Sequence, residues 1–375
     1  MSVSSSGLDF EDAIFDGQDG HIESTTAKIE DEHIALAVTL LIQSVGDSSS
    51  SRLVDDTEHV QSSDSSSILG SLTLRVVEAS LTSRVDTAHR DVIHDAQLNF
   101  YGTRLATCSS DRLIKVFDVK PNGQTFPLAE LVGHNGPVWQ LSWAHPKYEG
   151  LLASGSYDKK VIIWQESNGR WQKSYEHTGH EASVNAVAFA PPEYGLILAA
   201  ASADSNISFL QFNPATTQWV ATKIIKAHEQ GVNAISWAPY SPSNDGVVKR
   251  RVVTGGNDKL VKIWREDENG WTCEKTLNAH GDFVRDVAWR PVVHHNQHII
   301  ASCGQDRNAI LWKCNDINKG EWVPKLLEKD EGALWHVSWS QCGTILSVSG
   351  EDNKIVLWKE NLQNQWQKIE NEESN

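Results

Sequence analysis

The sequence predicts an all-β fold, a six-bladed β-propeller with four antiparallel strands per blade, which follows an acidic N-terminal arm. Two observations predict the propeller. A turn that contains Asp precedes an apolar, alternating run with an aromatic end, and this unit occurs six times. A His lies upstream of nearly every unit. A repeat of four short strands with a period in the high forties is typical of propeller blades.

The arm is predicted from its composition. Residues 1–85 hold 15 of the 49 acidic residues but only four of the 33 basic ones, and the arm contains the stretches SVGDSSSSR and QSSDSSS. Such segments bury too little apolar surface to offset the entropy of ordering. We therefore expect a mostly disordered arm at 1–81, a propeller at 82–370 and a polar tail at 371–375. Two alternatives for the arm are a partner-binding or phosphorylated segment, and a cis filler of the propeller formed by the strand-like residues 68–81.

Each blade is predicted from the same features, taken in chain order. The turn aspartates are Asp111, Asp158, Asp204, Asp258, Asp306 and Asp352, and the upstream histidines are His89, His134, His180, His228 and His280. The sixth blade has Asp330 where the others have His. Inner apolar runs follow at 138–143, 184–189, 232–237, 284–289 and 334–339, and an outer Trp follows in the later blades. Alternation with period two indicates antiparallel strands.

The units resemble WD repeats, in which a His, a Ser or Thr, the turn Asp and a Trp tie three strands of a blade together. That resemblance assigns the tie to the histidines and aspartates above, together with Trp164, Trp264, Trp312 and Trp358. Blade three is expected to carry Phe212 in place of Trp, and blade six lacks the His. Buried polar groups of this kind are tolerated only when each has a partner.

The number of strands at the chain ends predicts an open ring. ENLQNQWQKIEN follows Trp358 and resembles the outer strands of other blades, so blade six has its own fourth strand. The strand-like segment 80–88 is then surplus and cannot close the ring. Exposed blade faces and sheet edges are normally covered, so we expect a strand or blade from another chain. The alternative is an ordinary closure with a different strand assignment.

Longer stretches carry a more specific resemblance. HDAQLNFYGTRLATCSSDRLIKVFDV, GHNGPVWQLSWAHPKYEGLLASGSYDKKVIIW and AHGDFVRDVAW are similar to Sec-thirteen-type propellers, the small propeller subunits of the COPII outer coat and of the nuclear-pore Y-complex. The resemblance implies a structural scaffold completed by a blade from a large α-solenoid partner. That partner is a coat subunit in COPII and a nucleoporin in the Y-complex, and a nutrient-signalling complex on lysosomes is a further place for family members. The implied locations are ER exit sites and COPII vesicles, nuclear pores and the lysosomal membrane.

Other functions find less support in the sequence. The formal charge of −16 argues against direct nucleic-acid binding, and the five cysteines form no CxxC pair. Neither a P-loop nor a G-x-G-x-x-G motif occurs. We therefore expect no enzyme activity, cofactor or metal, and membrane association only through the coat. The alternative function is that of a closed WD peptide-binding adaptor, for example of a ubiquitin ligase.

The contact with the partner is predicted on the faces of blades one and six. The candidates are Val85, Leu98 and Phe100 on one side and Leu334, Trp335 and Val337 on the other.

Overall fold

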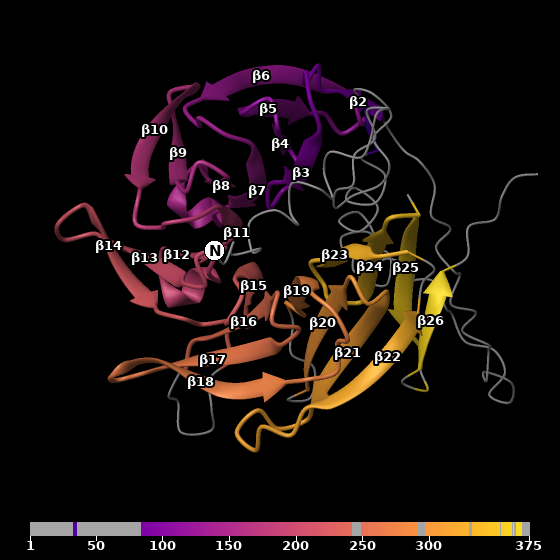
Figure 1. The fold of residues 1–375 in the computed structure, drawn as a ribbon. Helices are drawn as coiled ribbons and strands as arrows, with labels where there is room; N and C mark the ends of the chain where they lie inside the picture. The colour runs from indigo at the N-terminus through magenta and orange to yellow at the C-terminus, as the bar shows by residue number, and fades with distance from the viewer. Residues whose placement is uncertain are drawn as a thin grey trace, which may run out of the picture.

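The fold is a ring of six antiparallel sheets around a central axis (Figure 1). The computed structural model describes residues 33–35 and 84–369, apart from 242–248, 292–296, 330–331, 353, 362 and 364. Helical structure in these residues is limited to the 3-10 turns η1 (Pro146–Tyr148) and η2 (Pro192–Tyr194). None of the helices described is long and apolar enough to cross a membrane. The predicted all-β propeller with six blades is confirmed.

Each blade is one sheet whose four strands follow chain order from the axis outward (Figure 1). Blade 1 has β3 (Ile93–Leu98), β4 (Arg104–Ser109), β5 (Leu113–Val119) and β6 (Thr125–Val132). Blade 2 has β7 (Val138–Trp143), β8 (Leu151–Ser156), β9 (Val161–Ser167) and β10 (Arg170–His177). Blade 3 has β11 (Val184–Phe189), β12 (Ile197–Ser202), β13 (Ile207–Asn213) and β14 (Gln218–Ile224).

The second half of the chain repeats this plan. Blade 4 has β15 (Val232–Trp237), β16 (Arg251–Gly256), β17 (Val261–Asp267) and β18 (Gly270–Leu277). Blade 5 has β19 (Val284–Trp289), β20 (His298–Gly304), β21 (Asn308–Cys314) and β22 (Val323–Lys329). Blade 6 has β23 (Leu334–Trp339), β24 (Ile345–Gly350), β25 (Ile355–Glu360) and β26 (Trp366–Ile369). Blade 6 thus has its own outer strand, as the strand count predicted.

Most of the hydrophobic core lies between neighbouring blades. Five clusters each join one blade to the next, and every one combines side chains from two adjacent sheets. The cluster between blades 1 and 2, for example, joins Ile114 and Val116 to Leu152 and Trp164. Second strands such as β8 are buried along their whole length, since they have a blade on each side. Each buried aliphatic side chain contributes about 1.5–3 kcal/mol, so contacts between neighbouring blades hold the ring together.

The sixth interface, between blades 6 and 1, has no such shared cluster among the described residues. Blade 1 has its own cluster on this side, with Ile93, Leu105 and Phe117. Blade 6 has a small separate cluster, in which Ile355 and Ile369 pack on Ile345 and Leu357. Consecutive inner strands pack against each other from β3 to β23, but β23 and β3 do not pack to that extent. We call the place between these two faces the seam.

Strand β2 (Arg84–Asp86) lies at the seam and belongs to none of the six sheets. It pairs antiparallel with β1 (His33–Ala35), with Ile34 opposite Val85. Val85 precedes His89 as Leu131 precedes His134 and Ile224 precedes His228, and all three apolar residues pack into the cluster of the blade that follows. Because Leu131 and Ile224 lie at or next to the ends of the outer strands of the preceding blades, β2 occupies the place where an outer strand would end in a blade before blade 1.

One sequence prediction about strand positions is wrong, and several others fall on residues that the structure does not describe. The prediction of Phe212 at the Trp position of blade 3 is wrong: Leu210 pairs with Leu198 as Trp164 pairs with Leu152, so Leu210 holds that position. Phe212 packs against Trp219 instead. Asp330, the tail and the possible cis filler at 68–81 lie outside the described residues, as does the arm apart from β1.

Candidate partner-binding seam

In four blades one buried His bonds both an Asp and a hydroxyl, and in three of these a Trp completes the tie. In blade 2 the His134 ring nitrogens lie 3.0 Å from an Asp158 oxygen and 2.8 Å from the Ser154 hydroxyl, to which Trp164 also donates at 2.9 Å. Blade 4 repeats this with His228, Asp258, Thr254 and Trp264, and blade 5 with His280, Asp306, Ser302 and Trp312. In blade 1, His89 bonds Asp111 and Thr107, and Phe117 replaces the Trp.

The ties of blades 3 and 6 are incomplete. His180 contacts Asp204 at 2.9 Å, but its Nε2 is buried with no hydrogen-bond partner because Ala200 stands where blade 2 has Ser154. In blade 6, Asp352 accepts from the Lys354 amide, and Trp358 is a buried core residue. The two blades expected to depart from the repeat thus have incomplete ties, but in blade 3 the cause is Ala200 and not Phe212.

The ties change the pKa values of their aspartates. Burial, the largest single influence, raises the pKa of each carboxyl, but the hydrogen bond and charge of the His together with backbone amide donors outweigh it, so the pKa values of Asp111, Asp258 and Asp306 fall to about 2. The pKa of Asp204 is lowered in the same way. These carboxylates are ionised throughout the neutral range, as a structural tie requires.

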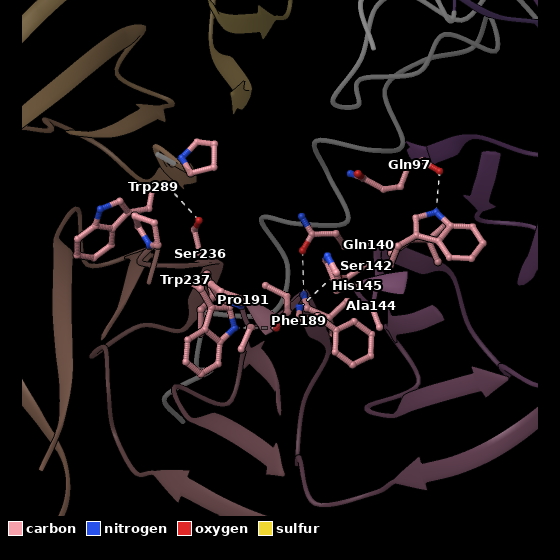
Figure 2. Close-up of a pocket in the computed structure, with 18 of the residues that line it drawn as sticks. Gln97, Gln140, Ser142, Ala144, His145, Phe189, Pro191, Ser236, Trp237 and Trp289 are labelled. Atoms are coloured by element: carbon pink, nitrogen blue, oxygen red, sulfur yellow. Dashed lines mark hydrogen bonds between the residues drawn. The ribbon is translucent and has the colours of Figure 1, made fainter. Parts of the chain in front are cut away.

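A second set of hydrogen bonds joins inner strands of neighbouring blades. The third residue of one inner strand accepts from the fourth amide of the next: Asp95 from Leu141, and Gln140 from Val187. Trp143 donates across the boundary between blades 1 and 2 to the Gln97 carbonyl oxygen, and Trp237 donates across the boundary between blades 3 and 4 to the Ala188 carbonyl oxygen. Figure 2 shows part of this set around a cavity of about 940 Å³, which the inner strands and the loops that follow them line.

The last of these hydrogen-bonded boundaries, between blades 5 and 6, uses charged residues next to the seam. Asp286 accepts from the Val337 amide at 2.9 Å and from His336 Nδ1 at 2.6 Å. Burial lowers the pKa of His336, but the charge of Asp286 and its hydrogen bond outweigh burial, and Asp95 of blade 1 acts in the same direction, so the pKa is raised. His336 is the third residue of β23, and therefore occupies the position from which Asp95, Gln140 and Asp286 bond the next blade.

The predicted contact residues fall into two groups. Val85, Leu98, Leu334 and Val337 are 1%, 7%, 3% and 2% exposed, and the last two belong to the cluster between blades 5 and 6. Leu334 and Val337 thus pack toward blade 5, whereas Val85 and Leu98 belong to the blade 1 cluster at the seam, and partner contact by these four stays a prediction. Phe100 is 48% exposed and Trp335 half-buried, with its ring under the Arg285 guanidinium, and partner contact by these two stays a prediction.

The repeats contain a seam feature that the prediction missed. In blades 1, 5 and 6, the second strand points two small side chains toward the next blade. They are Ala106 and Cys108 in blade 1 and Ala301 and Cys303 in blade 5, but Ser347 and Ser349 in blade 6. The Ser347 hydroxyl donates to the Ser338 carbonyl oxygen, and the Ser349 hydroxyl is buried with no partner. Aligning the six second strands with one another would have revealed this substitution.

In the described parts of the chain, a side-chain hydrogen bond joins the two sides of the seam. Gln341 Nε2, in the turn between β23 and β24, donates to the Phe100 carbonyl oxygen at 3.0 Å. Phe100 also packs edge-on against Tyr101 and His145, so the blade 1 side of this link is aromatic.

Comparison with known proteins decides the family. The family model described as "WD domain, G-beta repeat" matches this chain six times, at residues 82–118, 125–165, 171–209, 219–265, 271–313 and 324–359. "Protein SEC13 homolog" of Caenorhabditis briggsae is 62% identical over 78% of this chain and 95% of that protein. The protein of the same name from Homo sapiens is 52% identical over 76% of this chain and 92% of that protein. The chain belongs to the Sec13 family of WD-repeat propellers. A fungal Sec13-family relative, "Protein transport protein sec13" of Emericella nidulans, is 47% identical over 76% of this chain and 96% of its own.

A further match concerns the arm. Residues 1–98 match the description "NAD-specific glutamate dehydrogenase". This match covers about a quarter of the chain and overlaps the first WD repeat from residue 82, where residues 93–98 form β3 of the propeller. The Sec13 family, a family of structural and transport propellers, accounts for the rest of the chain.

Proposed function

We propose that this protein is a scaffold subunit of the COPII vesicle outer coat, which acts in ER-to-Golgi transport, and of the nuclear-pore Y-complex. In each assembly an α-solenoid partner inserts a blade into the seam, a coat subunit in one and a nucleoporin in the other. Its places of action are ER exit sites, COPII vesicles and the nuclear envelope, and a lysosomal nutrient-signalling complex is a further one. The protein acts as a structural subunit and catalyses no reaction.

The observation that carries the proposal is the pair of separate clusters at the seam. Every other boundary shares one cluster between two blades, whereas Phe117 and Leu357 here belong to different clusters. Strand β2 holds the place of an outer-strand end, so the chain itself marks the position of a seventh blade. An inserted blade would join the two clusters as the other five interfaces are joined.

Two polar features favour an inserted polypeptide over a lipid or a small apolar ligand. The buried Ser349 hydroxyl lacks a partner, and a backbone carbonyl or amide of an added strand would satisfy it. His336 stands where the inner strands of other blades bond the next blade. An α-solenoid locked to a β-disc through such a blade resists bending at that joint, as a curved coat lattice requires.

The test uses the full chain with the candidate blade segment of the coat subunit, measured by light scattering and by titration. We expect a 1:1 complex that survives high salt. Ile355→Glu places a charge on the blade 6 side of the seam and should weaken binding at least tenfold, because an unpaired charge would be buried. Val220→Glu, the same type of change on the exposed outer strand β14, is the control and should leave affinity unchanged.

Two results would contradict the proposal. Binding that is equally unaffected by both variants would move the partner site away from the seam. A chain that ignores the segment and binds short peptides as a monomer would favour the peptide-adaptor function.

A further inference from the structure

The turn Ser340–Thr344 between β23 and β24 contains Cys342, the half-buried thiol beside the Gln341 link across the seam. The turn is closed by the Gly343 amide, which donates to the Ser340 carbonyl oxygen at 2.8 Å. Gly343 has a φ of 66°, a conformation that favours glycine. We propose that Cys342 is a site of reversible oxidation by hydrogen peroxide or a related small peroxide, which converts it to a sulfenic acid.

Two hydroxyls are placed to donate to the sulfur. The Ser340 hydroxyl oxygen already accepts from the Thr344 and Ile345 amides at 3.2 and 3.1 Å, so its own proton is free to point to Cys342 Sγ at 3.4 Å. The Thr344 hydroxyl lies 2.9 Å from the same sulfur. Hydrogen bonds that point at a sulfur favour its thiolate, which is the form that reacts with peroxides.

An independent feature of the site is an unused donor under the turn. Arg290 is 7% exposed, and its Nε has no hydrogen-bond partner. A methyl group placed on Gly343 would lie 3.1 Å from that nitrogen, so the guanidinium packs directly against the turn. Its Nη1 is 3.8 Å from Glu360, a loose ion pair, while Lys313 lies closer to the same carboxylate. This unpartnered N–H therefore lies against the turn that carries Cys342, and Cys342 acts electrostatically on the guanidinium.

The other cysteines lack this environment. Cys108 and Cys303 are fully buried, and burial raises their pKa values well above the usual range. Cys314 is also buried. Burial likewise raises the pKa of Cys342, but the bonds from Ser340 and Thr344 outweigh burial and the pKa is lowered. Cys273 is exposed, and its sulfur lies 3.7 Å from the Thr276 hydroxyl, so it is the natural comparison.

The reaction balances with peroxide as the named oxidant. The thiolate sulfur attacks one peroxide oxygen, an S–O bond forms and the O–O bond breaks. Sulfur loses two electrons, and the other oxygen leaves as hydroxide, which takes a proton to become water. A second thiol can reduce the sulfenic acid through a mixed disulfide, which makes the modification reversible.

The test treats the folded full chain with limiting hydrogen peroxide, traps sulfenic acid with dimedone and measures each cysteine by peptide mass spectrometry. We expect Cys342 to be trapped about ten times faster than the more exposed Cys273. In parallel, the rate of iodoacetamide labelling measured against pH should have its midpoint at a lower pH for Cys342 than for Cys273. Thr344→Val, which removes the hydroxyl and keeps the shape, should slow oxidation of Cys342 several-fold. Thr276→Val beside Cys273 is the matched control.

The proposal is overturned if native Cys342 reacts no faster than Cys273, or if its labelling midpoint is no lower. An unchanged rate in folded Thr344→Val would also overturn it. None of these measurements involves a partner, so their outcome is independent of the proposed scaffold function.

Discussion

At the residue scale, each complete tie uses both nitrogens of a buried His. The Ser154 hydroxyl hydrogen-bonds His134 Nε2, accepts from the Trp164 indole and lies 3.3 Å from the Ile162 carbonyl oxygen, so one hydroxyl contacts three groups. Removing a shared partner leaves two buried groups unsatisfied, and each such group costs about 1–3 kcal/mol. The ties therefore act as local stability elements that differ from blade to blade.

Ser154→Ala and Ala200→Ser should shift stability in opposite directions. The first change leaves His134 Nε2 and the Trp164 indole without partners, and we expect a loss of about 2–4 kcal/mol. The second offers a hydroxyl to the unpartnered His180 Nε2, and we expect a gain of about 1 kcal/mol. Urea unfolding monitored by tryptophan fluorescence measures both. Destabilisation by Ala200→Ser would show that blade 3 has no room for the tie.

The tie aspartates also predict an acid transition. Since the pKa values of Asp111, Asp258 and Asp306 are lowered to about 2 in the folded chain, the unfolded chain binds protons first. Their stabilisation is complete above the ordinary Asp pKa of about 4 and is lost as the pH falls toward 2. Unfolding free energies measured from pH 5 to pH 2 should fall steadily. Asp258→Asn should be less stable at pH 5 and show a shallower decline.

At the element scale, one carboxylate of β19 bonds two groups of the inner strand β23. Asp286 accepts from both His336 and the Val337 amide, so the charge of His336 influences how firmly the last blade is attached. Asp95 of β3 acts on the same His from the far side of the seam, and the Leu141 and Ala96 amides and the Gln97 side chain occupy its oxygens. The strand at the seam is therefore tuned by charge as well as by apolar packing.

The raised pKa of His336 sets the sign of a pH effect at this strand. The folded chain holds the proton more tightly than the unfolded chain, so the stabilisation is fully present below the unfolded pKa of about 6.5. It is lost as the pH rises through the folded value. Hydrogen exchange of the β23 amides should accelerate as the pH increases beyond that expected from intrinsic exchange, and His336→Gln should remove the excess. An equal excess in the variant would exclude His336 as the cause.

At the scale of the whole molecule, the ring has five complete interfaces and one seam. A partner that joins the two seam clusters binds only the folded ring and stabilises it by mass action. At a hundred times its Kd this amounts to about 2.7 kcal/mol. Differential scanning calorimetry should show a higher Tm for the full chain with the blade segment than without it. Ile355→Glu should abolish that rise while Val220→Glu keeps it, and an unchanged Tm for the native pair would count against insertion.

Repeat spacing was sufficient to predict six blades, their strand order and the His–Asp pairs of five blades, because spacing and alternation are properties of the chain alone. Even the self-contained blade 6 followed from counting strands past Trp358. The choice of Phe212 over Leu210 failed because a two-residue offset keeps the same alternation, and only the pairing with Leu198 resolves it.

The seam residues required the tertiary structure. Val85 and Leu98 are apolar on strands that alternate, but the direction in which each side chain points depends on which sheet lies beside it, and burial depends on that neighbour. The surroundings of Cys342 likewise combine a turn of blade 6 with Arg290 of the preceding blade, which lies 52 positions earlier in the sequence. Such contacts arise only when the ring brings distant blades together, and no local pattern in the chain encodes them.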